Sequence, residues 1–96
     1  MDLNRALQIA IKTGKVKIGS REAIKIARKG EAKLIIIAKN CPTRIRNKLK
    51  EFNLPMYEYS GQSTELGLAC GLPYTIAALA IVDPGESEIL SLLRGA

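Results

Sequence analysis

The side chain of this sequence that is best suited to covalent chemistry is a thiol. Cys41 precedes a proline and a helical pattern, and a thiol beside a helix N-terminus can have a lowered pKa and act as a nucleophile. The chain contains no histidine, so the commonest general base and the commonest zinc ligand are both missing. Cys41 and Cys70 lack the spacing of metal ligands, and we expect both to be reduced thiols. These observations predict a protein that is not an enzyme and uses no metal or cofactor; a small enzyme that uses Cys41 is the alternative.

Polar residues near the start of a predicted helix have types that suit a polyanionic ligand. Arg21 and Lys25 lie one helical turn apart, so they share a helix face and could follow a phosphate backbone, although solvated surface charges have the same pattern. Glu22, between them, fits the acid that complements a helix dipole in a first turn. Asn40 ends an apolar run, where asparagine commonly forms a turn, and Gly19 suits a turn at a strand end. Each of these residues therefore has a structural explanation beside a functional one.

The distribution of charge favours a nucleic-acid partner more strongly. Residues 1–50 carry 14 of the 15 lysines and arginines and three acids, a net charge of +11, whereas residues 51–96 carry one arginine and six acids, a net charge of −5. The overall charge of +6 could by itself reflect lysines that keep a surface soluble. Segregation along the chain instead indicates a basic face for a polyanion, to which Lys39, Arg44, Arg46 and Lys48 would add charge.

The length and the apolar pattern bound the class of protein. A chain of 96 residues fits a single domain, residues 1–96, because a second core could not be buried. The longest apolar run, Leu34–Ala38, is far shorter than the roughly 20 residues that span a bilayer. The first residues show no secretory signal, so we expect a cytoplasmic protein without a membrane partner.

The elements that must position the candidate residues follow from hydrophobic periodicity and turn residues. Helices are predicted over residues 3–13, 21–29, 64–70 and 87–93, and strands over residues 15–18, 33–38 and 74–82, with a short strand within residues 54–59. A further helix should begin near Pro42 and turn Ile45, Leu49 and Phe52 inward. Gly19–Ser20 is expected to supply the N-cap of the second helix, and Ser63 or Thr64 that of the fourth.

Strands that alternate with helices predict an α/β fold. We expect a three-layer α/β/α sandwich with a four-stranded mixed sheet, largely parallel, and about five helices. In such folds the loops that leave the carboxyl ends of strands form the binding edge, so residues 19–21, 39–41 and 60–64 should converge there. If the last strand runs antiparallel to its neighbours, the loop of residues 71–74 before it joins the same edge.

Several segments, spread over essentially the whole chain, carry a resemblance to a known family. They are Gly19–Lys25, Leu34–Pro42, Thr64–Gly67, Gly71 and Val82–Ser87. Through them the chain resembles the large-subunit ribosomal protein thirty family of archaea and eukaryotes. This family belongs to the kink-turn-binding superfamily, which also holds the seven-A-e ribosomal and guide-RNA proteins. The Asp-Pro-Gly-Glu-Ser ending is similar to the archaeal type in particular.

The resemblance implies binding to a kink-turn in ribosomal RNA. A kink-turn is a helix, internal loop and helix with tandem sheared G·A pairs, a sharp bend and one base turned outward, and proteins read such exposed edges. Gly19 would let the backbone approach the RNA closely, and Asn40 would contact a guanine edge through an amide that donates and accepts. The start of the second helix would face the G·A pairs, and the apolar loop would pack around the extruded base. The implied RNA-binding residues are Gly19, Ser20, Arg21, Glu22, Lys25, Lys39, Asn40, Leu72, Pro73 and Tyr74.

The same resemblance implies partners and leaves alternatives. It places the protein on the ribosome, with ribosomal RNA and other large-subunit components as partners, and as a monomer when free. Glu22 is typical of the seven-A-e branch, so a kink-turn-binding core subunit of a guide-RNA ribonucleoprotein is an alternative. A module that binds only proteins, marked by an exposed apolar patch, is another.

Overall fold

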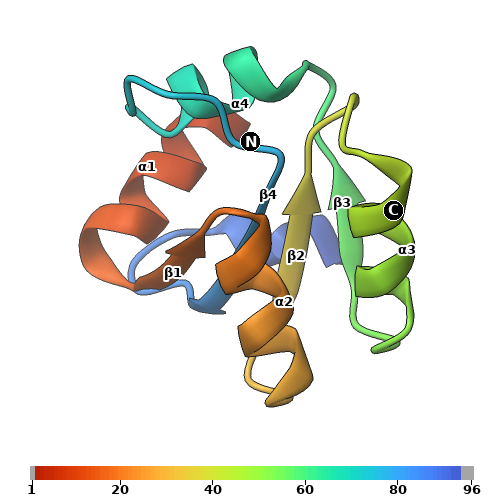
Figure 1. Cartoon of the computed structure of the whole chain (residues 1–96). Coiled ribbons are helices and arrows are strands. Elements are labelled where there is room, and N and C mark those ends of the chain that lie inside the picture. Colours follow the sequence, from red (N-terminus) through yellow and green to blue (C-terminus); the bar gives the residue numbers. More distant parts are fainter. Residues whose placement is uncertain (1, 94–96) are drawn as a thin grey trace.

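Two apolar strands form the centre of the protein. In the computed structural model, which describes residues 2–93, β2 (Leu34–Ile37) and β4 (Ala78–Asp83) lie side by side with most of their residues buried. β1 (Lys15–Ile18) and β3 (Met56–Glu58) flank them, giving one sheet with the order β1-β4-β2-β3 (Figure 1). Runs of β-branched residues suit this central position because helices cover both faces of the sheet.

The directions of the strands decide which loops meet. β4 pairs antiparallel with both β1 and β2, whereas β2 pairs parallel with β3. β1, β2 and β3 therefore run in the same direction, and β4 runs against them. The prediction of a four-stranded mixed sheet is confirmed. The expectation that it is largely parallel is wrong, because the reversed β4 makes two of the three strand pairs antiparallel. The condition for the fourth loop is also met, because the start of β4 lies beside the carboxyl ends of β1 and β2.

One face of the sheet is covered by α1 (Leu3–Thr13), α4 (Ser63–Ala69) and a 3-10 helix, η1 (Ile89–Leu93). The apolar residues of these helices pack against alternate residues of the central strands. The strand residues on this face are Leu34, Ile36, Leu79 and Ile81. This layer therefore contains the larger of two apolar cores, one on each side of the sheet.

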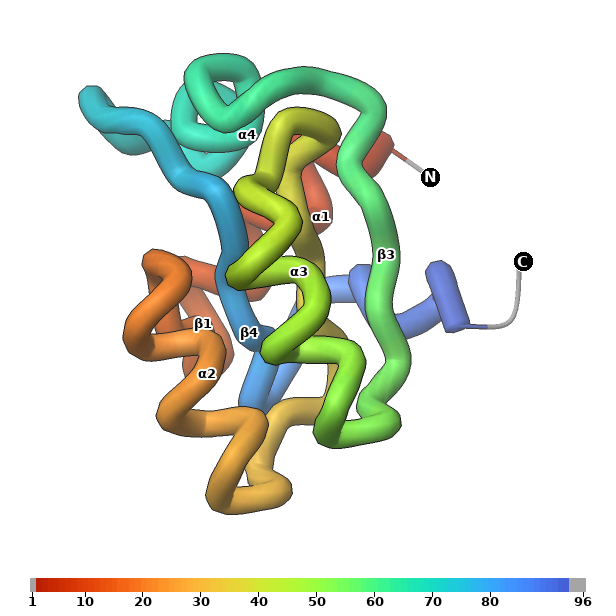
Figure 2. Tube along the Cα trace, turned by 45° about the vertical axis from the view of Figure 1, so that its right-hand side comes forward, coloured from red at the N-terminus to blue at the C-terminus, as the bar shows by residue number. Residues whose placement is uncertain are grey.

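The other face is covered by α2 (Ser20–Arg28) and α3 (Thr43–Lys50), which lie side by side in front of the strands in Figure 2. They pack on the intervening strand residues Ile35, Ile37, Ala78 and Ala80. The predicted three layers are thus confirmed, and the four α-helices and one 3-10 helix of residues 2–93 are close to the expected five. No helix within residues 2–93 has the length and apolarity needed to cross a membrane.

Two predicted elements differ from the structure in extent or type. The last strand begins at Ala78 rather than Tyr74, because the amide of Ile76 donates to the carbonyl of Ser63 at 3.0 Å and keeps the preceding residues in a loop. The final helix is a 3-10 turn, in which the amide of Ser91 donates to the carbonyl of Glu88 at 2.9 Å. The start of β4 is therefore set by a tertiary hydrogen bond and the type of the last helix by a local one, and apolar periodicity alone predicts neither.

The start of α4 also differs from expectation. Its cap position is Gln62, not Ser63 or Thr64, and the carboxylate of Glu65 accepts a hydrogen bond from the amide of Gln62 at 3.1 Å. Because Glu65 satisfies this amide from within the first turn, the helix begins one residue earlier than its hydroxyl side chains suggest.

The central strands lead to a stability prediction. Leu79 is fully buried in β4, whereas Leu68 on α4 is 71% exposed. Leu79→Ala should lower the free energy of unfolding by about 2–5 kcal/mol, through lost burial and the cavity left behind. The matched Leu68→Ala should change it by less than about 0.5 kcal/mol. Urea denaturation followed by circular dichroism measures both values, and equal losses would contradict the assigned core.

Candidate nucleic-acid interface

The four loops at one end of the sheet are joined by backbone hydrogen bonds. The amide of Gly19, after β1, donates to the carbonyl of Ala78 at 2.9 Å. The amide of Ala38, after β2, donates to the carbonyl of Ala77 at 2.8 Å. In Figures 1 and 2 these loops and α4 lie at the end of the sheet toward which β1, β2 and β3 point. The predicted binding edge is therefore one continuous surface.

Gly19 forms the turn between β1 and α2 in a conformation that favours glycine. Its φ of +104° lies in the region that L side chains rarely adopt, and a Cβ built there would meet no atom within 4 Å. The space above this turn is therefore open. Gly19 is also the cap residue of α2, as expected of the pair Gly19–Ser20, but no side chain caps the helix. The first amides of α2 thus face the binding edge as potential anion donors.

The first two turns of α2 present charge to solvent. Arg21 and Lys25 are exposed, and Glu22 is half-buried between them. The ion pairs within residues 2–93 are Arg46 with Glu58 and Lys48 with Glu51, so none of these three α2 side chains has such a partner there. Two cations and a carboxylate are therefore available to a ligand on the predicted face.

Asn40 connects two of the loops. Its Oδ1 accepts a hydrogen bond from the amide of Ser63 at 2.8 Å, and its Nδ2 lies 3.5 Å from the hydroxyl oxygen of Ser63. The side chain thus satisfies the first amide of α4 from a different loop, in the way a helix cap does. Asn40 remains exposed, and an amide group can form further hydrogen bonds. Its structural role is a tertiary contact, which the sequence alone did not reveal.

Of the cations Lys39 and Arg46 after β2, the first is exposed and can bind a ligand at the edge, and the second is engaged in contacts within the protein. Lys39 is exposed, and its amide donates to the carbonyl of Gly61 at 2.9 Å. Arg46 donates from its guanidinium to Glu58 at 2.6 Å and to the carbonyl of Lys39 at 3.2 Å. Arg46 therefore fastens the β2–α3 loop to the end of β3, and its expected contribution as free charge is replaced by a structural one.

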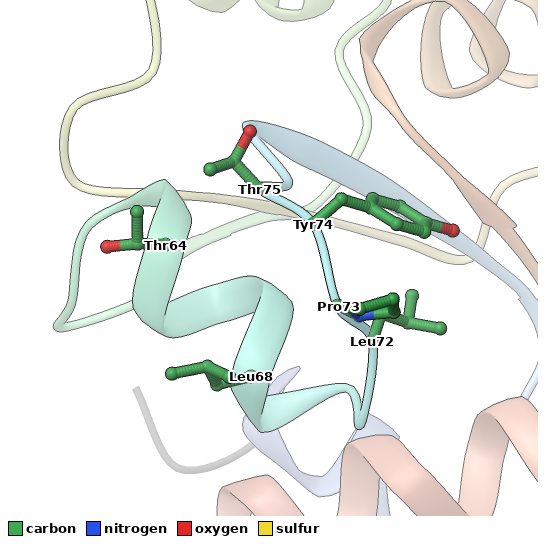
Figure 3. A pocket seen from close by; sticks show the side chains of 6 residues that line it. All are labelled: Thr64, Leu68, Leu72, Pro73, Tyr74 and Thr75. Atoms are coloured by element: carbon green, nitrogen blue, oxygen red, sulfur yellow. The ribbon is translucent and has the colours of Figure 1, made fainter.

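The apolar loop lies beside α4 and borders a shallow hollow of about 220 Å³. Figure 3 shows Leu72, Pro73 and Tyr74 along this loop, with the Leu72 and Tyr74 side chains extending to the same side. Tyr74 is 56% exposed, whereas Leu72 is half-buried and also packs on the core of α1 and α4. Leu72 therefore combines the two roles that the sequence left open, and Tyr74 is the residue that a base could stack on.

Residues that the sequence analysis missed complete the hollow. Its lining includes Thr64, Leu68 and Thr75 as well as the loop itself. Leu68 is an apolar side chain that is 71% exposed on a short helix. The signal in the sequence was its spacing of two residues from the buried Leu66, which puts the two leucines on different faces of a helix. Gly67 allows the loop to lie close against α4, because a Cβ at this position would lie 1.9 Å from the carbonyl oxygen of Tyr74.

The thiols are placed unfavourably for catalysis. Cys41 and Cys70 are free and buried. Burial raises the pKa of the Cys41 thiol, and the charge of Arg46 offsets only part of this, so Cys41 does not have the lowered pKa that a thiol beside a helix N-terminus can have. Burial raises the pKa of Cys70 to about 11. Within residues 2–93 no group of three or more histidine, cysteine or acidic side chains could hold a metal ion.

Comparison with known proteins gives one family. The family described as "Ribosomal protein L7Ae/L30e/S12e/Gadd45 family" matches residues 1–91 of this chain. The chain is 46% identical over 94 residues to the large ribosomal subunit protein eL30 of Methanothrix thermoacetophila, covering 98% of this chain and 91% of the relative. It is 48% identical to eL30 of Methanosarcina mazei, over 95% of this chain and 88% of the relative. For eL30 of Methanoregula boonei the identity is 46%, and all of both chains is covered.

The contact between Asn40 and Ser63 predicts a loss of stability. Asn40→Ala should lower the free energy of unfolding by about 0.5–2 kcal/mol, because it leaves the first amide of α4 without its acceptor. Asn47, exposed on α3 and without such a contact, is the matched control, and Asn47→Ala should not destabilise the protein. Thermal and urea denaturation of both variants measures the difference. If the Asn40→Ala variant is as stable as the Asn47→Ala variant, the hydrogen bond between Asn40 and Ser63 does not have the assigned role.

The raised pKa values predict slow thiol modification. A change for Cys70 from 9.0 to about 11 lowers the thiolate fraction near pH 8 roughly a hundredfold, and burial limits access further. Iodoacetamide at pH 8 should therefore leave both cysteines of the folded protein unmodified for as long as it takes to label the urea-unfolded protein fully. Mass spectrometry reads the result, and rapid labelling of folded Cys41 would reopen a catalytic role.

Proposed function

The chain belongs to the ribosomal protein L7Ae/L30e/S12e/Gadd45 family, and from this membership we propose that it is a component of the large ribosomal subunit that binds and stabilises a kink-turn in ribosomal RNA. Its partners are then ribosomal RNA and neighbouring large-subunit components, and it works in the cytoplasm and is a monomer when free. The relatives are named as ribosomal proteins, and the chain is not an enzyme.

The observation that carries the proposal is the convergence of unlike groups on one edge. The start of α2 carries cations without an ion-pair partner within residues 2–93, and it lies beside an exposed amide at Asn40 and an apolar hollow at Tyr74. The loops at this edge are hydrogen-bonded to one another. A straight duplex offers phosphates but no unstacked base for the hollow. A bent RNA with an internal loop and an extruded base offers phosphates, base edges and an aromatic face together.

Each group has a role in this proposal. Arg21, Lys25 and Lys39 bind phosphates and supply most of the salt-dependent affinity. Glu22 accepts hydrogen bonds from the amino groups of sheared G·A pairs, to which the open turn at Gly19 gives access. Asn40 uses the hydrogen-bonding capacity left over from its contact with Ser63 to read a guanine edge.

The extruded base occupies the apolar hollow. Tyr74 provides the aromatic face, Pro73 extends it along the loop, and Leu72 and Leu68 border the hollow. Leu72 is anchored in the core, so the position of the loop does not depend on the ligand. The ribosomal and guide-RNA alternatives share this mode of binding, and Glu22, which has no ion-pair partner within residues 2–93, is compatible with both.

The proposed function is tested by a titration with two RNAs. One is a kink-turn oligonucleotide and the other has the same stems joined by Watson–Crick pairs in place of the internal loop. The protein should bind the kink-turn at least a hundredfold more tightly at 0.15 M salt, since it alone offers the base contacts. Equal affinity for both RNAs would reduce the proposal to non-specific binding.

A variant separates the role of the hollow from that of the charges. Tyr74→Ala should weaken binding to the kink-turn by about 1–3 kcal/mol, the value of one base stacked on an aromatic ring. The control is a kink-turn whose extruded nucleotide lacks its base: the wild type and Tyr74→Ala should bind that RNA equally. Calorimetry measures both, and an equal loss on the two RNAs would show that Tyr74 does not stack on the base.

A further inference from the structure

A second basic surface lies beyond the edge described above. It is an open groove between α2 and α3, on the face of the sheet opposite α1, made of two overlapping hollows of about 630 Å³ and 530 Å³ that share part of their lining. Figure 2 shows the two helices side by side along this face. The bottom of the groove is formed by Ile24 and Ile45, which are half-buried and packed on the core beneath. Its sides are basic.

The cations of α2 form a single row along the groove. Arg21, Lys25 and Arg28 are spaced four and three residues apart, so they fall on one stripe of the helix. At 1.5 Å per residue, the row spans roughly 10 Å. Arg44 and Lys48 are spaced four residues apart on α3 and line the opposite side. Two basic helix faces therefore look onto the same groove.

These cations are mostly uncompensated. Of the groove residues, only Lys48 has an ion-pair partner within residues 2–93, Glu51 at 3.6 Å. Among the described residues, Glu51 is also the one acid that lines the groove. Arg28 and Arg44 are exposed. Like charges held on facing helices repel one another, and a polyanion between them removes that repulsion.

The charge and the shape favour a phosphate backbone as the occupant. Phosphates follow one another a few ångströms apart along the axis of a duplex strand, so a row of roughly 10 Å can reach about three of them. The large apolar side chains that are exposed within residues 2–93, namely Leu68, Tyr74 and Leu93, lie outside the groove. The groove thus lacks the exposed apolar anchors that protein interfaces use.

The groove is also continuous with the proposed kink-turn site. Ser20, Arg21 and Lys25 belong to both surfaces, because they begin α2 at the edge and then run along the groove. We propose that the α2–α3 groove binds the phosphate backbone of a duplex stem that leaves the bent motif, with Arg28 and Arg44 as its distinguishing contacts. This inference rests on the proposed function and extends the RNA footprint along α2 and onto α3.

The test compares charge-matched variants on RNAs of two lengths. Arg28→Gln with Arg44→Gln removes two cations from the groove, and Lys33→Gln with Lys50→Gln removes two exposed cations outside it. One kink-turn RNA carries stems long enough to reach the groove, and the other has its stems cut to the few pairs next to the internal loop. Thermal denaturation first establishes that both double variants are folded.

The groove variant should bind the long-stem RNA roughly tenfold or more weakly than the wild type at 0.1 M salt. The slope of log K against log salt should fall by about two, since each phosphate contact contributes slightly under one unit. It should bind the short-stem RNA like the wild type, and the Lys33 and Lys50 variant should match the wild type on both. Unchanged affinity for the long-stem RNA, or equal losses on both RNAs, would overturn the inference.

Two further readings keep the outcomes distinct. If the wild type shows no preference for the kink-turn over the straight duplex, the proposed function fails. If the wild type prefers the kink-turn but the groove variant binds the long-stem RNA with unchanged affinity, only the assignment of the groove fails. The last measurement uses a polyglutamate peptide. If the wild type binds this peptide as tightly as the long-stem RNA, and the groove variant does not bind it, the groove binds an acidic protein segment and the assignment to RNA is wrong.

Discussion

The antiparallel insertion of β4 between β1 and β2 is the constraint on which the rest of the structure depends. In an all-parallel sheet, the loop before β4 would lie at the opposite end from the loops that leave the other strands. Because β4 runs against its neighbours, the segment that carries Leu72 and Tyr74 reaches the same edge as Gly19 and Asn40. One reversed strand thus brings apolar and polar loops together, and the short side chains Ala78 and Ala80 let α2 pack closely on it.

Most of the fold was predictable because it depends on local pattern. The continuous β-branched run of β2, the amphipathic period of α1 and the punctuation by Gly14 and Gly30 identify elements without tertiary information. Errors arose where a distant partner decides the outcome. Residues before Ala78 have a strand-like pattern, but the bond from Ile76 to Ser63 holds them in a loop. The extent of the single domain, residues 1–96, stays a prediction.

The candidate site was predictable in its location and less so in its contacts. A strand-end loop, a glycine turn and a row of cations can be found from spacing, and the resemblance adds the residues that face a ligand. It does not reveal that Asn40 satisfies the first amide of α4 or that Arg46 is held by Glu58, because both contacts join segments far apart in the chain. The sequence likewise leaves the direction of the Cys41 pKa open, because it does not show that burial of the thiol outweighs the charge of Arg46.

The hydrogen bonds at Ser63 have a thermodynamic consequence. Its amide donates to Asn40 while its carbonyl accepts from Ile76, so the loops are fastened to one another before any ligand arrives. A surface fixed in this way gives up little conformational entropy on association, and the cost of reaching the bound shape falls on the partner. Apparent affinity then follows the fraction of time that the partner spends in the matching shape. Ions or sequences that enrich this conformer would tighten the complex without touching the protein.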